Sequence, residues 1–304
     1  VLVWISFYND PSLASMGLTQ YKAVATDGFT LPVLADTLWL GVQVTLLCLV
    51  LGYALSWSYV RSPGALQKVL MLIIVMPLLT SVVVRTFAWI VILGRQGIVN
   101  NALMDLGLLD APLKLLYTRA GLVVALANVQ LPLMVLPLIN ALQKLDVNLA
   151  DASSSLGASE WQTFRKVTLP LSLPGIVAGC LLTFAASITA FISQSLIGGG
   201  QMLFMPMYIY QQASTLQNWP FAAAISIIFL VAVLAVVGGV LGVAAYLGSW
   251  VSNVQYSSMR VAQGFVLAAL IGVPLGLLIG WSRFVQQLFD PLIQSLRPIP
   301  ITAW

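Results

Sequence analysis

Long apolar runs alternate with shorter polar segments along the chain. A helix needs about 20 apolar residues to cross about 30 Å of hydrocarbon, and lipid offers no partners to backbone groups, so such runs are expected to be membrane-spanning helices. The runs cover residues 38–60, 69–93, 120–142, 174–196, 221–246, 264–281 and 291–304, and residues 1–8 have the pattern of a first span whose beginning is missing. The polar segments 9–36, 94–119, 143–173 and 198–220 are predicted to be connecting loops.

The composition fits the same interpretation. Of the 304 residues, 60% are hydrophobic and 7% are charged, and the mean hydropathy is +0.98. Soluble globular proteins carry about 25% charged residues, so this chain cannot cover a water-facing surface. Soluble enzymes and disordered tails are excluded. No nucleic-acid partner is expected either, because the net charge of +4 rests on 13 scattered Lys and Arg. The partner of most of this surface is a lipid bilayer.

The residues that usually hold metals or perform catalysis are scarce. The chain has no histidine, and its two cysteines, Cys48 and Cys180, lie inside apolar runs, where they are expected to be packing residues. No catalytic, cofactor or metal site is predicted. Lys and Arg in the segments 61–68 and 144–166 lie two crossings apart, hence on one side of the membrane, and the excess of positive charge in short loops places that side in the cytoplasm.

A weak repeat indicates two related units. The pattern Leu-Gly, four residues, Trp-Ser over residues 51–58 recurs over residues 275–282, and chance similarity between glycine-rich spans is the alternative. A true repeat would put Arg283 on the same side as Arg61, but counting the crossings puts it on the other side. We therefore predict a first unit over residues 1–248 and a partial second unit over residues 257–304, after an unrepresented segment. A genuine inversion is the other explanation.

The segment 143–173 is the most polar stretch and has the local signals of two short helices. Gly157 is expected to end the first helix in the left-handed conformation, and Ser159 with Gln162 forms the capping-box pattern that opens a second helix over residues 160–167. Pro170 and Pro174 are expected to end that helix and start the next span. One face carries an apolar ridge: Leu149, Ala152, Leu156, Trp161, Phe164 and Val167. Such a ridge suits docking into a partner's groove, with an interfacial helix on lipid headgroups as the alternative.

At these residues the chain resembles a known family. Asp151-Ala-Ser-Ser-Ser-Leu-Gly157-Ala, followed by Phe164, Val167, Leu169-Pro and Pro174-Gly, is similar to the EAA loop of ABC-importer permeases. It departs from that pattern at Asp151, where the family has Glu, and at Ser153, where it has Ala. The segments 107–114, 131–137 and 218–224 resemble the spermidine/putrescine permease branch, which covers residues 1–248, whereas residues 260–304 are more similar to nitrate/sulfonate/taurine-type permeases.

The resemblance implies an all-α polytopic membrane protein, the transmembrane domain of a type I ABC importer with a cytoplasmic coupling-helix loop over residues 143–173. It implies a location in the bacterial inner membrane. The partners would be two cytoplasmic ATPases that hold ATP and Mg, a second permease subunit or half, and an external solute-binding protein. The resemblance assigns the coupling contact to Asp151, Ala152, Gly157 and Ala158 and its anchoring to Phe164 and Leu169.

The residues independently favour an energy source outside the chain. No Gly-x-x-x-x-Gly-Lys-Ser/Thr motif is present, so ATP hydrolysis in this chain is not expected. An ion-coupled secondary transporter is the alternative, although no carboxylate lies deep in a span and Asp36 stands only at a span entrance. A membrane scaffold without transport activity is a further alternative.

Polar residues inside the spans are candidates for the pore or its gate: Arg85, Asn128, Gln130, Ser193 and Gln194. The plainer interpretations are snorkelling of Arg85 to the outer interface and interhelical hydrogen bonding by the rest. The resemblance implies a polyamine or a related organic amine as the solute. Because the spans offer a cation no carboxylate, either the external receptor selects the solute or the solute is not a polyamine.

Overall fold

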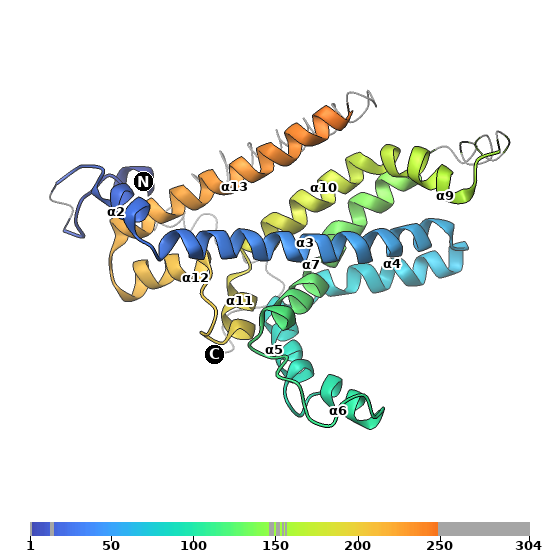
Figure 1. The fold of residues 1–304 in the computed structure, drawn as a ribbon, viewed down its shortest axis with the longest axis horizontal. Helices are drawn as coiled ribbons and strands as arrows, with labels where there is room; N and C mark the ends of the chain where they lie inside the picture. Colours follow the sequence, from blue (N-terminus) through green and yellow to red (C-terminus); the bar gives the residue numbers. More distant parts are fainter. Residues whose placement is uncertain are drawn as a thin grey trace, which may run out of the picture.

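A computed structural model describes residues 2–12, 15–145, 149, 153, 155 and 157–248. The regular structure of these residues is helical (Figure 1). The α-helices are α1 (Leu2–Ile5), α2 (Thr19–Thr26), α3 (Thr30–Arg61), α4 (Gly64–Leu79), α5 (Val82–Leu93), α6 (Ile98–Asp105), α7 (Arg119–Gln143), α9 (Glu160–Thr163), α10 (Leu169–Ile188), α11 (Phe191–Gly198), α12 (Met205–Tyr210) and α13 (Trp219–Gly248). Two π-helical turns are η1 (Phe164–Thr168) and η2 (Gln211–Thr215).

Among the described residues, five helical stretches are long and apolar enough to cross a membrane: Thr30–Arg61, Val82–Asp105, Arg119–Gln143, Glu160–Ile188 and Trp219–Tyr246. The expectation of an all-α polytopic membrane protein is therefore confirmed. The predicted second unit, residues 257–304, lies outside the described residues.

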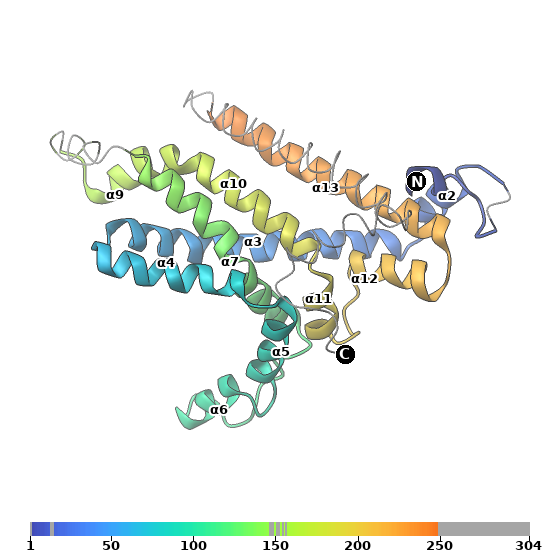
Figure 2. The ribbon, with the colours of Figure 1, turned by 180° about the vertical axis from the view of Figure 1, so that it is seen from behind.

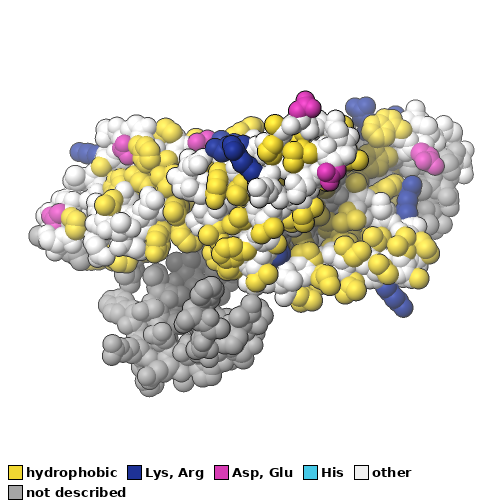
Figure 3. All heavy atoms as spheres, turned by 90° about the horizontal axis from the view of Figure 1, so that it is seen from below, with side chains coloured by type: hydrophobic (Ala, Val, Ile, Leu, Met, Phe, Trp, Pro, Cys, Tyr) yellow, Lys and Arg dark blue, Asp and Glu magenta, His cyan; other side chains and the backbone are white. Residues whose placement is uncertain are grey.

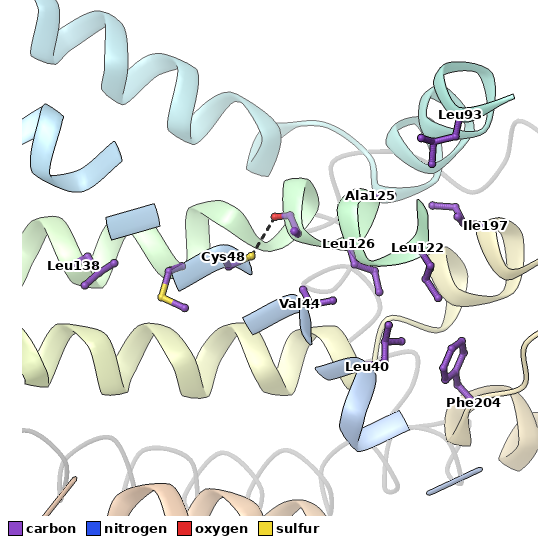
Figure 4. Close-up of a cluster of buried hydrophobic side chains, with 12 residues drawn as sticks. Leu40, Val44, Cys48, Leu93, Leu122, Ala125, Leu126, Leu138, Ile197 and Phe204 are labelled. Atoms are coloured by element: carbon purple, nitrogen blue, oxygen red, sulfur yellow. Dashed lines mark hydrogen bonds between the residues drawn. The ribbon is translucent and has the colours of Figure 1, made fainter. Parts of the chain in front are cut away.

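The core of the molecule lies where α3, α7 and α10 pack side by side (Figures 1 and 2). Fully buried apolar side chains from α3 and α7 meet there, and the Cys48 thiol donates to the Ala127 carbonyl oxygen at 3.3 Å (Figure 4). Small residues bring the helices close: Gly52 and Gly179 both lie against Met134. In lipid the hydrophobic effect does not drive helices together, so close packing and interhelical hydrogen bonds hold them in contact.

The periphery of this bundle is apolar. On α13, Val233 and Val237 pack against Phe184 and Ile188 of α10, while large apolar side chains such as Val231 remain exposed. Figure 3 shows hydrophobic side chains spread over the described part of one face, with scattered charged groups mainly toward its edges. Helices α5 and α6 lead away from the bundle (Figures 1 and 2). Such a surface suits lipid or further membrane subunits.

The structure corrects the predicted loop over residues 9–36. Helix α2 lies inside that segment, and α3 begins at Thr30. Asp27 marks the entry to α3, because its carboxylate accepts from the Phe29 N–H at 3.0 Å and from the Thr30 hydroxyl at 2.7 Å. Pro32 and Asp36 interrupt the apolar pattern before residue 38, whereas carboxylate bonds such as those of Asp27 can open a helix before its uninterrupted apolar run begins.

Three further boundaries differ from the prediction. The run 69–93 is divided into α4 and α5, because the backbone is extended at Thr80 and Ser81 just after Pro77. The segment predicted as the loop 94–119 contains α6, and the segment 198–220 contains α12 and η2.

Candidate functional site

The turn at Gly157 has the predicted geometry. Gly157 has φ +81°, in the left-handed region, and the Ala158 N–H donates to the Ser153 carbonyl oxygen at 3.2 Å. A bond across five positions around a left-handed glycine is the main bond of the Schellman motif. The predicted left-handed conformation of Gly157 is confirmed. Asp151 and Ala152, which the resemblance places in the coupling contact, lie outside the described residues.

The second helix opens on the capping box. The Gln162 N–H donates to the Ser159 hydroxyl at 3.3 Å, and the Ser159 N–H donates to the Gln162 side-chain oxygen at 3.1 Å. A further bond, 2.8 Å between the hydroxyls of Ser153 and Thr163, joins the two arms of the turn. Ser153 stands where the EAA pattern has Ala, so this departure from the pattern supplies a cross-link between the arms.

The second helix does not end at Pro170. Helix α9, η1 and α10 form one continuous rod from Glu160 to Ile188, and the predicted break is wrong. Proline has no N–H to donate, and its ring crowds the carbonyl four residues earlier. The wide turn η1, which the Leu169 N–H closes by donating to the Phe164 carbonyl oxygen, lies directly before Pro170 and accommodates both effects. The polar loop is therefore fused to the following span.

Four aromatic side chains, here called the aromatic seat, join this rod to α3: Tyr53, Trp57, Trp161 and Phe164. The Phe164 ring meets the rings of Tyr53 and Trp57 edge to face, with centroids 5.7 and 5.6 Å apart. It stacks on Trp161 at 5.5 Å. Phe164 is half-buried and faces α3, whereas Trp161 is 67% exposed. The prediction that both residues belong to one exposed ridge is therefore wrong for Phe164.

Two polar contacts extend the aromatic seat. The Arg61 guanidinium carbon lies 4.1 Å from the centre of the Trp57 ring. The hydroxyls of Tyr53 and Ser172 are 3.1 Å apart, and Ser172 also donates to the carbonyl oxygen of Leu169, the other predicted anchor. Sequence reasoning missed Tyr53 and Trp57, although their spacing of four residues places them on one face of a helix.

Two of the predicted pore residues stabilise a break between helices. The expected span 174–196 is divided, because α10 ends at Ile188 and α11 begins at Phe191. The Gln194 side-chain amide donates to the carbonyl oxygens of Ser187 and Ile188 at 2.8 and 3.3 Å, which satisfies acceptors that the end of α10 leaves free. Ser193 is buried and its hydroxyl is 3.0 Å from that of Thr86 on α5. These contacts match the interhelical hydrogen-bonding interpretation.

The other three candidates differ in their surroundings. The Asn128 side-chain oxygen accepts from the Trp89 indole at 3.2 Å in an exposed position, and Gln130 is buried. Arg85 is half-buried, and its Nε and Nη1 atoms are buried without a hydrogen-bond partner among the described residues. Of the five candidates, Arg85 is the charged one, and a partner for the buried Nε and Nη1 atoms of its guanidinium would have to come from outside the described residues. The bond from its neighbour Thr86 places it at the contact of α5 with α11.

An ion pair that the sequence did not predict joins the first residue of α7 to α3. Arg119, the first residue of α7, donates to the Asp36 carboxylate at 2.9 Å and to the Gln43 side-chain oxygen at 2.9 Å. Asp36 and Gln43 lie two turns apart on α3. The carboxylate at the span entrance is therefore already paired with a cation.

Comparison with known proteins places this geometry in a family. Residues 48–251 match the family described as "Binding-protein-dependent transport system inner membrane component". The chain is 34% identical over 220 residues to the spermidine/putrescine transport system permease protein PotB of Salmonella typhimurium, with 72% of this chain and 77% of the relative covered.

Solved structures agree with the fold. A bacterial ABC transporter for import of the acidic polysaccharide alginate matches with a TM-score of 0.67 at 17% identity, covering 79% of this chain and 86% of that chain. A bacterial alginate ABC transporter in complex with an alginate pentasaccharide-bound periplasmic protein matches with a TM-score of 0.65 at 19% identity, covering 75% and 83%.

These matches decide between the alternatives raised by the sequence. The chain is a multi-pass protein of the inner membrane that works with a periplasmic binding protein, and ATP hydrolysis in this family belongs to separate subunits. The ion-coupled transporter and the membrane scaffold are set aside. The chain belongs to the family of binding-protein-dependent transport system inner membrane components and is a permease component of an ABC importer.

Proposed function

We propose that the segment 143–173 is the coupling loop of this importer and that cytoplasmic ATPases dock on it. The observation that carries the proposal is the left-handed turn at Gly157, where the Ser153–Thr163 bond ties the residue before the turn to the helical rod that continues into α10. The indole of Trp161 stacks on Phe164 and remains 67% exposed on this element, and an exposed aromatic side chain is a typical anchor for a partner's groove.

The position of the segment supports the same assignment. It lies at the end of the bundle where α3 ends and α4 begins (Figure 1). Arg61, Lys68, Lys144, Arg165 and Lys166 belong to elements at this end. An excess of Lys and Arg in short connections is typical of the cytoplasmic side. ATP and Mg would bind to two such ATPases rather than to this chain, and a second permease subunit or half would complete the pore.

For the solute we propose a polyamine or a related organic amine. The support comes from PotB, whose name assigns it to spermidine and putrescine transport. A cation would find Asp36 already neutralised by Arg119 at the entrance, and Arg85 inside α5 would repel it. Selection of the solute therefore belongs to the external binding protein, and the membrane path serves as a conduit.

Reconstitution of the complete importer in proteoliposomes tests both parts. The vesicles contain this permease with its ATPases, and the binding protein is added on the side opposite the coupling loop. ATP on the side that carries the coupling loop should then drive movement of labelled spermidine or putrescine to that side. Omission of the binding protein should abolish uptake. The whole segment 149–168 can be replaced by a flexible linker; if the ATPases still co-purify with that variant, the docking assignment is wrong. Uptake of other solutes in preference to amines would contradict the solute class.

A further inference from the structure

The aromatic seat lies at the one place where the rod Glu160–Ile188 departs from α-helical geometry. Phe164 is both the ring held by Tyr53 and Trp57 and the residue whose carbonyl oxygen accepts the bond that closes η1. A π-turn widens the helix locally and is a recurrent feature of functional sites. Because the rod is widened there, a lateral contact at Phe164 determines how movement of the coupling loop is shared between α3 and α10.

The contact reaches two spans at once. Trp57 and Tyr53 belong to α3, whereas Phe164 leads into α10, and the Tyr53–Ser172 hydroxyl contact of 3.1 Å ties the same two helices together about two turns further along the rod. The edge-to-face geometry is directional, since a ring edge carries partial positive charge and a ring face partial negative charge. Arg61 lies over the Trp57 ring at 4.1 Å and adds a second directional contact to that indole.

We infer that Trp57 is a positioning residue for energy coupling: it holds Phe164 so that movement of the coupling loop is passed to α3 as well as to α10. This inference rests on the proposed function of segment 143–173. Without the indole, the loop still docks on the ATPases, but its movement passes along the rod into α10 alone and α3 does not follow. ATP is then hydrolysed without the corresponding movement of solute.

The test is the number of ATP molecules hydrolysed per solute taken up by the assembled importer in proteoliposomes. For Trp57→Leu, which keeps an apolar side chain but removes the aromatic face, this ratio should rise roughly fivefold, as expected for the loss of a directional aromatic contact. Trp57→Phe, which keeps a ring, should restore a ratio close to that of the wild type. Trp39→Leu is the matched control, because Trp39 is an exposed tryptophan on the same helix and should leave the ratio unchanged.

The outcomes separate this inference from a structural role and from the proposed function. If Trp57 only supports folding, the amount of importer falls, hydrolysis and uptake fall together, and the ratio stays at the wild-type value, which overturns the inference. A ratio that Trp57→Phe fails to restore overturns it too. Should Trp57→Leu fail to assemble, Tyr53→Leu removes the opposite wall of the aromatic seat and must show the same raised ratio. Wild-type importer that hydrolyses ATP without transporting amines contradicts the proposed function instead.

Discussion

Replacement of Gly157 by valine is the sharpest test of the left-handed turn that precedes α9. The backbone there has φ +81°, and a Cβ placed on Gly157 would meet nothing within 4 Å, so the penalty is conformational rather than steric. A β-branched residue held in the left-handed region costs about 1–2 kcal/mol. That cost changes the equilibrium between the closed and the opened turn by a factor of roughly 5–30.

The opened turn loses the bond from the Ala158 N–H to the Ser153 carbonyl oxygen and separates the docking surface from the rod. We therefore expect Gly157→Val to insert into the membrane in normal amounts and to hydrolyse ATP with little solute uptake. The assay is hydrolysis and uptake measured on the same proteoliposomes, with permease content determined by quantitative blotting.

Asparagine at the same position is the matched control, because Asn adopts the left-handed conformation far more readily than valine does. Gly157→Asn should keep most of the uptake. If the valine and asparagine variants transport equally well, the left-handed turn is not needed for coupling and the reasoning fails.

Three further predictions concern packing, capping and pH. Gly175→Ala should lower the unfolding temperature in detergent and cost about 1–3 kcal/mol of stability, because the new Cβ would approach a backbone carbonyl oxygen of α7 at 2.8 Å. Gly239→Ala is the control, because a Cβ there meets nothing within 4 Å and should leave the unfolding temperature unchanged. Ser159→Ala should cost about 1 kcal/mol of local stability, seen as faster amide exchange over α9; unchanged exchange would mean that the capping box contributes nothing. The hydrogen bond from the Thr30 hydroxyl lowers the pKa of Asp27, so the stabilisation that this bond gives is full above the ordinary carboxyl pKa and is lost as pH falls through the lowered value. Thr30→Val should make acid unfolding less steep, and an identical pH profile for both proteins would refute the assignment.

Local signals in the sequence sufficed for features that neighbouring residues determine. The left-handed turn at Gly157 and the Ser159–Gln162 capping box depend on residues within five positions of each other, and both were predicted correctly. The charge-free run 120–142 likewise matches α7 to within one residue at each end.

Features set by distant partners could not be predicted in the same way. The break between α10 and α11 lies inside a charge-free run, and it is stabilised because the Gln194 side chain donates to carbonyl oxygens that lipid would leave unpaired. The Phe164 side chain faces α3 because it packs against the rings of Tyr53 and Trp57, which lie more than 100 positions earlier in the chain. The same holds for Asp36, whose pairing with Arg119 depends on how α3 and α7 pack.

The unbroken rod from Glu160 to Ile188 makes the length of this stretch as important as its composition. Each residue of an α-helix turns the chain by about 100° and advances it by about 1.5 Å. Deleting one residue between Thr163 and Ser172 would rotate the outer arm by roughly that angle relative to the buried face of the span, and Trp161 would point in a new direction. Substitutions here can weaken the coupling by degrees, whereas a deletion rotates everything beyond it by a full step of the helix.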